Sequence, residues 1–393
     1  MMPDATGLHG PTTPTPEQVR DVAALANRVF RPDGRGDMGE QYPLLFDPDR
    51  TEQMRIYVRD DTVVSHVGVR VDEVLLCGAT VRMACIGAVC TDTDARGQGL
   101  AGALFKDAVR YAMDLGASVM LISGDRSLYR RAGAYPAGRF LHARAERSLL
   151  DDRAGDIELQ RVTPAEAPDA LRLFETESIR FRRTSQDYAA QLACGMLCNR
   201  PGQTWQALVG GSPVAVVSCF ALPADEGRGI TALCVEEMAG DRRAALTAAG
   251  RLAAEQGAPT VTVTGHAADH ALAAVLAEIG AAVEHRPFHP GSTIKLLDLP
   301  RLWTDARPLL RERIGDAAER IVVTQTIDED GVVQAAEFAF DGQRVKIEGA
   351  EAVVHTFLGR PDGQAMTCAS GRLGELLGLA LPLPLPMYGL NYT

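Results

Sequence analysis

The chain has 393 residues, more than a single hydrophobic core usually organises, so its length predicts two or three domains. Hydrophobic residues make up 46% and charged residues 23%, a composition typical of a globular protein that excludes a largely disordered one. Forty basic against fifty-one acidic residues give a formal charge of −11, which argues against general nucleic-acid binding. The charge is compatible with a cationic substrate or with a surface adapted for solubility.

The first residues, MMPDATGLHGPTTPTPEQVRD, lack the basic and apolar regions of a signal peptide. No run reaches the roughly 18 apolar residues that a membrane span needs. The eight cysteines lie mostly in apolar strand-like runs, and CGMLC at 194–198 has no matching second pair. We therefore expect a cytoplasmic protein with free thiols, no bound metal and no membrane association.

The first 148 residues predict a mixed α/β domain. TPEQVRDVAALANRVF predicts an amphipathic helix with Thr15 as its N-cap and a proline at its first helical position. Residues 54–91 form successive strand-like runs with a turn at Asp60-Asp61. A helix over about 99–115, a buried strand in ASVMLISG and a short helix in SLYRRAGAYPAG complete the domain.

The middle of the chain repeats this order and predicts a second copy of the domain at residues 149–298. TWQALVGGSPVAVVSCF resembles MRIYVRDDTVVSHVGV, GITALCVEE resembles CIGAVCTDT, and APTVTVTG resembles ASVMLISG, in the same order along the chain. The second copy has lost the arginine and the interior glycine of one turn: Gly240, Arg243 and Ala245 stand in register with Arg96, Gly99 and Ala101. We expect this copy to lack the ligand of the first.

Residues 299–393 predict a third, smaller α/β domain. Two helical segments, LWTDARPLLRERIG and GRLGELLGLA, enclose hairpin-like runs. The chain then closes with LPLPLPMYGLNYT, in which prolines alternate with apolar residues. A tail this apolar is expected to pack against the rest of the protein.

The segment DARGQGLAGALF at 94–105 places two glycines where a strand gives way to a helix. Free backbone amides at a helix N-terminus form an anion site, and Arg96 can add a bidentate contact to phosphate. Gly97 and Gly99 let an oxyanion approach the backbone, and Ala101 keeps the first helical turn slim. The alternative is a tight connection with no ligand, and the segment fits neither a Walker loop nor a dinucleotide motif.

Here the sequence resembles a family. VCTDTDARGQGLAGALFKDAVRYAMDLGASVMLIS is similar to the coenzyme A-binding segment of the GNAT acyltransferases, with Arg96, Gly99 and Ala101 in the fixed positions of their [RQ]-x-x-G-x-[GA] motif. The resemblance implies acetyl-CoA as the acetyl donor. It implies pyrophosphate contacts at the turn and pantetheine contacts along the preceding strand, with Ser123 as a further candidate: Ala88, Val89, Cys90, Arg96, Gly97, Gln98, Gly99, Leu100, Ala101, Gly102 and Ser123.

The wider layout resembles the Eis-like acetyltransferases. The implied fold class is α/β (α+β): two tandem GNAT-like mixed-sheet domains, the second degenerate, and a C-terminal domain that looks like a sterol carrier protein. The domains implied are 1–148, 149–298 and 299–393. Similarity to these enzymes also implies a homo-oligomer, a hexamer built from trimers.

Tyr129 in SLYRRAGAYP is the candidate general acid. A tyrosine in this Y-x-R-x-G setting protonates the leaving thiolate in the resembling family, although Ala132 departs from the aromatic residue often found there. The alternative is a tyrosine that only packs its ring and bonds a backbone group. Tyr135 is interpreted as structural.

The candidate base is the α-carboxylate of Thr393, because Eis-like enzymes bring their chain end into the active site. A well-packed tail without that role is the alternative. His66 lies in a strand where it is either near the substrate or a satisfied core residue. The pairs His266/His270 and His285/His289 match no zinc motif. Asp37 and Glu40, in a glycine-rich charged loop, are candidates for attracting a cation, and a solvated loop is the alternative. Arg180, Arg182 and Arg183 are expected to face solvent or a neighbouring subunit.

The sequence thus predicts an acetyl-CoA-dependent N-acetyltransferase acting on a primary amine of a small cationic molecule or on a lysine. Two alternatives stay open: a coenzyme A-sensing or lipid-binding protein without turnover, and an interaction scaffold whose first turn is empty. Intact Arg96, Gly99, Ala101 and Tyr129 favour the enzyme.

Overall fold

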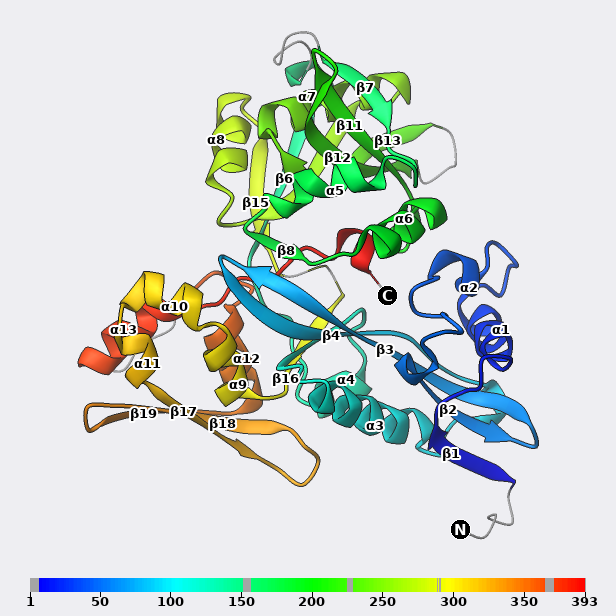
Figure 1. Ribbon diagram of the computed structural model, residues 1–393, viewed down its shortest axis with the longest axis vertical. Helices are drawn as coiled ribbons and strands as arrows, with labels where there is room; N and C mark the ends of the chain where they lie inside the picture. Colours follow the sequence, from blue (N-terminus) through cyan, green and yellow to red (C-terminus); the bar gives the residue numbers. More distant parts are fainter. Residues whose placement is uncertain are drawn as a thin grey trace.

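The computed structural model describes residues 7–150, 157–224, 229–287, 289, 291–364 and 371–392. Figure 1 shows two sheet-containing units, one above the other, with a third unit beside the lower one. Thr393 and Cys368 lie outside the described residues. No helix in the described ranges is both long and apolar enough to cross a membrane.

The first sheet contains one parallel strand pair, and the other pairs are antiparallel. Its main path runs through β1 (Leu8–Thr12), β2 (Met54–Arg59), β3 (Thr62–Leu76), β4 (Ala79–Thr91), β5 (Val119–Ile122) and β16 (Thr293–Leu296), and β8 (Ile179–Phe181) pairs with β3. Asp60 and Asp61 both have positive φ (48° and 61°), which makes the tight turn that joins β2 to β3. The predicted turn at this dipeptide is confirmed.

Helices cover both faces of the first sheet, and we call the sheet with these helices the first unit. They are α1 (Val19–Phe30), α2 (Met38–Gln41), α3 (Leu100–Asp114) and α4 (Ser127–Arg131). Val22 and Leu25 of α1 are fully buried, as the helical spacing predicts. Helix α1 begins at Val19 after Gln18, three residues later than expected, because Thr15 starts a separate turn in which Gln18 N–H donates to its carbonyl at 3.0 Å.

The second sheet repeats the order of the first, and with its helices it forms the second unit. Its strands run β15 (Ala282–Arg286), β6 (Phe140–Glu146), β14 (Thr260–His266), β13 (Ile230–Gly240), β12 (Ser212–Pro223), β11 (Gln203–Val209) and β7 (Glu158–Arg161). Its helices are α5 (Ala167–Glu175), α6 (Ser185–Cys194), α7 (Arg242–Glu255) and α8 (His270–Glu278), and β9 (Met196–Leu197) and β10 (Arg200–Pro201) form a small hairpin.

The two sheets exchange a strand. β6 follows the first unit in the sequence but pairs with β14 and β15, while β16 follows the second unit but pairs with β5. β6 ends just before the expected boundary at residue 148 and β16 just before that at 298, so each strand lies inside one expected domain and pairs in the sheet of the other. Neither sheet is therefore complete without a segment adjacent to the other unit.

The third unit packs against the first sheet. It contains α9 (Leu299–Asp305), α10 (Arg307–Ile314), α11 (Ala317–Arg320), β17 (Val322–Ile327), β18 (Val333–Phe340), β19 (Gln343–Glu348), α12 (Ala350–Leu358) and α13 (Arg372–Ala380). Trp303, Phe338 and Phe357 are buried in one core with Met83 and Leu121 of the first sheet. A single hydrophobic core thus joins the first and third units.

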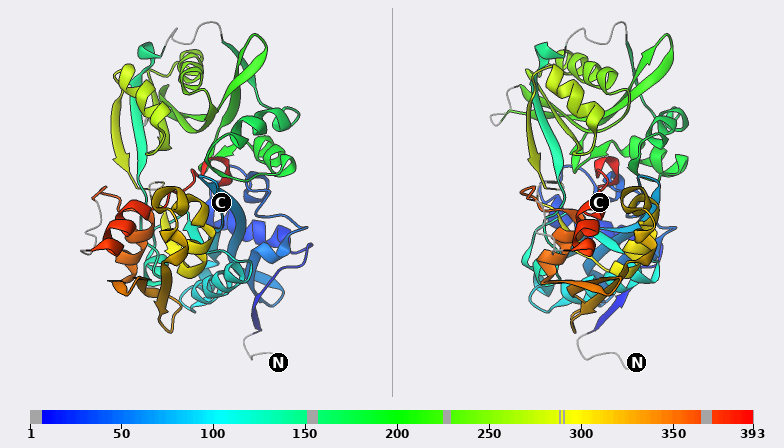
Figure 2. Two further views of the ribbon diagram at one scale, coloured as in Figure 1. Left: turned by 60° about the vertical axis from the view of Figure 1, so that its left-hand side comes forward. Right: turned by 90° about the vertical axis from the view of Figure 1, so that its left-hand side faces the viewer.

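The closing segment, residues 381–392, is the tail. Leu383, Leu385, Tyr388 and Leu390 are buried, so the packing predicted from the proline pattern is confirmed. The views of Figure 2 agree with Figure 1 that the tail, drawn in red, runs between the second unit and the first.

Candidate functional site

Strands β4 and β5 separate at a defined point. Their parallel ladder ends at the pair Ile86 and Ile122, where Ser123 N–H still donates to the Ile86 carbonyl at 3.5 Å. β4 continues beyond this point to Thr91, whereas β5 stops. The gap that opens exposes one edge of β4 between the two strands.

A bulge in β4 lies directly beside this gap. Ala88 has a positive φ of 49°, and the register between β3 and β4 shifts between His66 and Gly68. His66 is fully buried, and burial lowers the pKa of its ring to about 4. The ring is therefore neutral, and its Nδ1–H donates to the Ala88 carbonyl over 2.9 Å. His66 is thus a core residue that holds the bulge through Nδ1, but it is not the fully satisfied histidine of the second interpretation, because its buried Nε2 has no hydrogen-bond partner among the described residues.

A cavity of about 190 Å³ fills the gap, and we call it the first cavity. Ala88 and Val89 of β4 line one side, and Ser123 and Tyr129 line the other. Four residues that the sequence predicts to contact the donor or to act on it, three as cofactor contacts and Tyr129 as the general acid, thus line one cavity.

The glycine turn leads from β4 to the N-terminus of α3. Gly97 and Gly99 adopt φ of 78° and 77°, a region that L side chains rarely occupy. A Cβ at either glycine would meet no heavy atom within 4 Å, so the backbone here faces open space. Gly99 is the N-cap of α3 and has no side chain to bond the first amides, which leaves the helix N-terminus available to an anion.

Arg96 and Gln98 lie exposed on this turn. The Nε of Arg96 donates to the Thr91 carbonyl at 3.3 Å, and Gln98 accepts a 2.6 Å hydrogen bond from Arg59. Both side chains are therefore held beside the helix N-terminus. Leu100 is buried and anchors the helix, while Ala101 and Gly102 leave the first turn slim.

Tyr129 is buried with 5% of its surface exposed and lines the first cavity. Its ring packs against Phe105 with centroids 5.7 Å apart, and a Cβ on Gly124 would come within 2.9 Å of it. Burial raises the pKa of Tyr129 to about 12, although Arg126 lowers it slightly. The phenol therefore keeps its proton at neutral pH and can serve as a donor.

Ser123 links the tail to this cavity. Its hydroxyl donates to the Ile86 carbonyl at 3.2 Å. The Tyr392 phenol also forms a hydrogen bond with Ser123. Burial, the larger cause, raises the pKa of Tyr392, and the Ser123 contact lowers it. Tyr392 lines the first cavity, so the tail reaches the separation point of β4 and β5.

Two charged residues of the second unit hold the tail in place. Arg183 donates to the Asn391 side chain at 2.7 Å and forms an ion pair with Glu237, also at 2.7 Å. Glu237 in turn accepts the Leu390 N–H at 3.2 Å. The expectation that Arg183 faces solvent or a subunit is wrong: its side chain is 3% exposed and lies between Glu237 and the tail. Its partner Asn391 is 208 residues away in the sequence, so no local pattern could reveal the contact.

Sequence reasoning missed Asn199 as a member of this site. Its side-chain oxygen accepts from the Tyr42 hydroxyl at 2.7 Å and from Arg31 at 3.1 Å, which joins the second unit to α1 and α2. Asn199, Tyr42 and Arg31 all line the first cavity. No local pattern marks Asn199, since its partners lie 157 and 168 residues away.

The weaker candidates have structural partners. Asp37 is the N-cap of α2 and accepts from the amides of Gly39 and Glu40, so its carboxylate is not free to attract a cation. His266 bonds the Leu385 carbonyl in the tail at 2.6 Å. Within the described ranges, no group of three His, Cys, Asp or Glu side chains is placed to hold a metal ion.

Comparisons with known proteins extend this geometry. Residues 12–137 match the model of an acetyltransferase (GNAT) domain. A GCN5-related N-acetyltransferase from Kribbella flavida is 17% identical, with 98% of each chain covered and a TM-score of 0.63. One from Anabaena variabilis is 13% identical over 96% of this chain and 98% of that chain, with a TM-score of 0.65.

Eis1 from Mycobacterium abscessus is 12% identical over 90% of this chain and 89% of that chain, with a TM-score of 0.59. Among curated proteins, none matches the sequence significantly. At such low identities the solved structures establish the fold. The chain therefore contains a GNAT acetyltransferase domain at residues 12–137 and shares the fold of these N-acetyltransferases over nearly its whole length.

Proposed function

We propose that the protein is an acetyl-CoA-dependent N-acetyltransferase that acts on a primary amine. The observation that carries this proposal is the separation of β4 from β5 at Ile86, beside a buried tyrosine and on the strand that leads to an open glycine turn at a helix N-terminus. A thioester held along the edge of β4 would have its diphosphate at the turn and its acyl group beside Tyr129.

The residues present fit such a donor. The backbone amides at Gln98–Gly102, with the guanidinium of Arg96, suit the two phosphates because helix N-termini and arginines both favour anions. The bulged backbone at Ala88, Val89 and Cys90 would pair with the extended pantetheine arm. Acetyl-CoA supplies an acetyl group activated as a thioester, and the coenzyme A thiolate is a good leaving group.

The proposed transfer uses two groups of this chain. The amine nitrogen attacks the thioester carbonyl carbon, the carbon–sulfur bond then breaks, and the Tyr129 hydroxyl gives its proton to the departing sulfur. The α-carboxylate of Thr393 would take the proton that the amine loses. Support for this base comes from the adjoining Tyr392, which already lines the first cavity.

Three further expectations belong to this proposal. The third unit would be similar to a sterol carrier protein and would shape the acceptor side, the protein would assemble as a hexamer built from trimers, and it would act in the cytoplasm. The acceptor is a small amine or a lysine side chain.

Free-thiol release from acetyl-CoA tests the proposal, using untagged protein and a panel of aminoglycosides, polyamines and lysine peptides. We expect release that depends on the amine and falls about a hundredfold or more in Tyr129→Phe, because general-acid catalysis typically contributes 10²–10⁴-fold. Tyr135→Phe is the matched control, since Tyr135 stacks with Arg130 and does not line the first cavity.

Bound acetyl-CoA without thiol release for any amine would favour a coenzyme A-sensing protein instead. If saturating acetyl-CoA does not raise the melting temperature, the scaffold alternative is correct. A protein extended beyond Thr393 by a C-terminal tag that keeps its full rate would exclude the terminal carboxylate as the base.

A further inference from the structure

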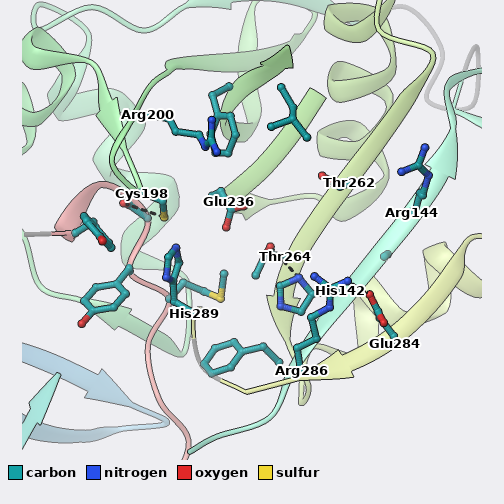
Figure 3. Close-up of a pocket in the computed structure, with 18 of the residues that line it drawn as sticks. His142, Arg144, Cys198, Arg200, Glu236, Thr262, Thr264, Glu284, Arg286 and His289 are labelled. Atoms are coloured by element: carbon teal, nitrogen blue, oxygen red, sulfur yellow. Dashed lines mark hydrogen bonds and ion pairs between the residues drawn. The ribbon is translucent and has the colours of Figure 1, made fainter. Parts of the chain in front are cut away.

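A second and larger cavity, of about 960 Å³, lies on one face of the second sheet. Figure 3 shows that the side chains of Glu236, Thr264 and His142 converge in it from β13, β14 and β6. Because strand side chains alternate, these residues lie on the face opposite to Val235 and Val263, which pack in the core that contains α7 and α8. A cavity of this size accommodates a small organic molecule.

The corresponding face of the first sheet is closed. There Cys85 and Leu121 lie in the core formed with the third unit and the tail. Their counterparts in the parallel ladder of the second sheet are Cys234 and Thr262. The described residues of the third unit do not cover this face, and the second cavity lies on it. At one of these positions the second sheet carries a polar side chain, Thr262, where the first sheet packs Leu121 in its core.

Three of these side chains lie in a row. The Thr264 hydroxyl is hydrogen-bonded to Nδ1 of His142 at 3.4 Å. Glu236 is the next polar group, and its contact with Thr264 lowers the pKa of the carboxyl. Burial, followed by the charge of Arg286, lowers the pKa of His142 to about 4, so its ring is neutral. Burial raises the pKa of Glu236 to about 7, while the Thr264 contact lowers it, so Glu236 is mainly ionised at pH 8.

The charge on Glu236 is the basis for assigning a direction to the hydrogen bond between Thr264 and His142. A hydroxyl has one hydrogen, so when Thr264 donates to the Glu236 carboxylate it must accept from Nδ1–H of His142. The proton of the neutral ring is then on Nδ1, which leaves Nε2 as an acceptor. Nε2 of His142 is buried and has no hydrogen-bond partner among the described residues. A buried acceptor without a donor is costly and marks a position for a ligand hydrogen.

The charges around the cavity favour a neutral donor over an ammonium group. Three arginines, Arg144, Arg200 and Arg286, line the cavity against two carboxylates, Glu236 and Glu284. Glu284 is already paired with Arg286 at the exposed rim. An ammonium group placed beside His142 would therefore have more cationic than anionic neighbours.

The cavity adjoins the reaction site. Asn199 and Tyr392 line both cavities and therefore form the wall between them. The two cavities are therefore neighbours. The walls of the second cavity also include Phe140, Phe220 and Met387, which suit an apolar linker between two polar ends.

The following inference rests on the proposed acetyl transfer. We propose that the second cavity holds the end of the acceptor that lies away from the reacting amine. Nε2 of His142 accepts a hydrogen bond from a neutral hydroxyl group at that end. The acceptor is thus an amino alcohol, with the amine in the first cavity and the hydroxyl in the second. Glu236 and Thr264 act as positioning residues that keep Nε2 an acceptor.

The test compares three series at pH 8: amino alcohols of two to eight carbons, alkylamines of the same lengths, and the matching terminal diamines. We expect one or two lengths at which the amino alcohol exceeds the alkylamine by about tenfold in kcat/KM, because an unpaired buried group rejects the analogue that lacks the donor. His142→Phe and Thr264→Val should each bring this ratio close to one. His285→Phe, the same change on the exposed β15, should leave it unchanged.

Calorimetric binding of the preferred amino alcohol, without acetyl-CoA, separates this inference from the proposed transfer. Weaker binding in His142→Phe but not in His285→Phe supports the second cavity even if no amine is acetylated. Equal kcat/KM for alcohol and alkylamine at every length would overturn the inference and leave the transferase intact. A preference for diamines that survives His142→Phe would likewise overturn it.

Discussion

The first and second units use the same strand, turn and helix for different purposes. In the first unit twelve residues (87–98) separate the end of the parallel ladder from the N-cap Gly99, whereas in the second unit five residues (236–240) separate it from the N-cap Asp241. The Asp241 carboxylate accepts the Ala244 amide. A helix N-terminus that attracts anions is thus left open in one copy and filled by its own side chain in the other.

The arginines of the two turns also differ, one being exposed and the other paired inside the protein. Arg96 is exposed beside the open N-terminus of α3. Arg242, at the start of α7, is largely buried and pairs with Glu177 at 2.6 Å and with Asp269 at 2.7 Å. In the second copy the counterparts of the anion site are therefore internal ion pairs and a capped helix N-terminus.

The largest effect is expected from removing the contacts that Arg183 and Glu237 make with the tail. Arg183→Met leaves Glu237 buried without its partner and should lower the free energy of unfolding by about 3 kcal/mol. Chemical denaturation measures this loss, and thiol release should fall with it because Tyr392 is no longer held at Ser123. Arg182→Met is the matched control: its side chain is 55% exposed and pairs with Glu73 at 3.3 Å, so the change should be below about 0.5 kcal/mol.

Giving the first turn the features of the second turn should abolish tight binding of acetyl-CoA. Arg96→Ala combined with Gly99→Asp removes one cation and places a carboxylate at the N-terminus of α3, which should raise the Kd for acetyl-CoA about a hundredfold. Calorimetry measures the Kd. Arg110→Ala, an exposed residue further along the same helix, should leave it unchanged. Equal affinity in the double variant would show that the turn does not hold the phosphates.

The polar face of the second sheet predicts a pH dependence of stability. The folded-state pKa of Glu236 is raised from 4.5 to about 7 by burial, so the folded state holds a proton that the unfolded state has released. The free energy of unfolding should therefore decrease by about 3 kcal/mol as the pH rises from 4.5 through 7. Glu236→Gln should remove this dependence, whereas Glu284→Gln at the exposed rim should retain it.

The smallest effect separates capping from ligand binding. Asp241→Ala removes the N-cap of α7 and should cost about 1 kcal/mol of stability. The Kd for acetyl-CoA should stay at the wild-type value. A changed Kd would mean that the second turn takes part in donor binding.

Much of the fold could be predicted from the sequence because its signals are local. The hairpin at Asp60-Asp61, the glycine turn before α3 and the buried strand β5 all depend on residues near one another in the chain. The tandem repeat was equally visible. The alignment of the two turns was not: the N-caps place Gly99 opposite Asp241, whereas the sequence register had paired Gly99 with Arg243, because the shorter second turn shifts the alignment.

The rest depended on contacts between distant segments. The strand exchange of β6 and β16 leaves each strand's own sequence unchanged, so no local pattern could reveal it. Asn199 and Arg183 reach partners more than 150 residues away, and the second cavity exists because the third unit covers one sheet and not the other. Such features follow from packing and not from periodicity.

The number of acetyl-CoA sites per chain tests the central claim most directly. We predict that calorimetric titration finds one site, that Arg96→Ala with Gly99→Asp removes it, and that Asp241→Ala preserves it. Two sites per chain, or one site that persists in the first-unit variant, would contradict the assignment of donor binding to the first turn.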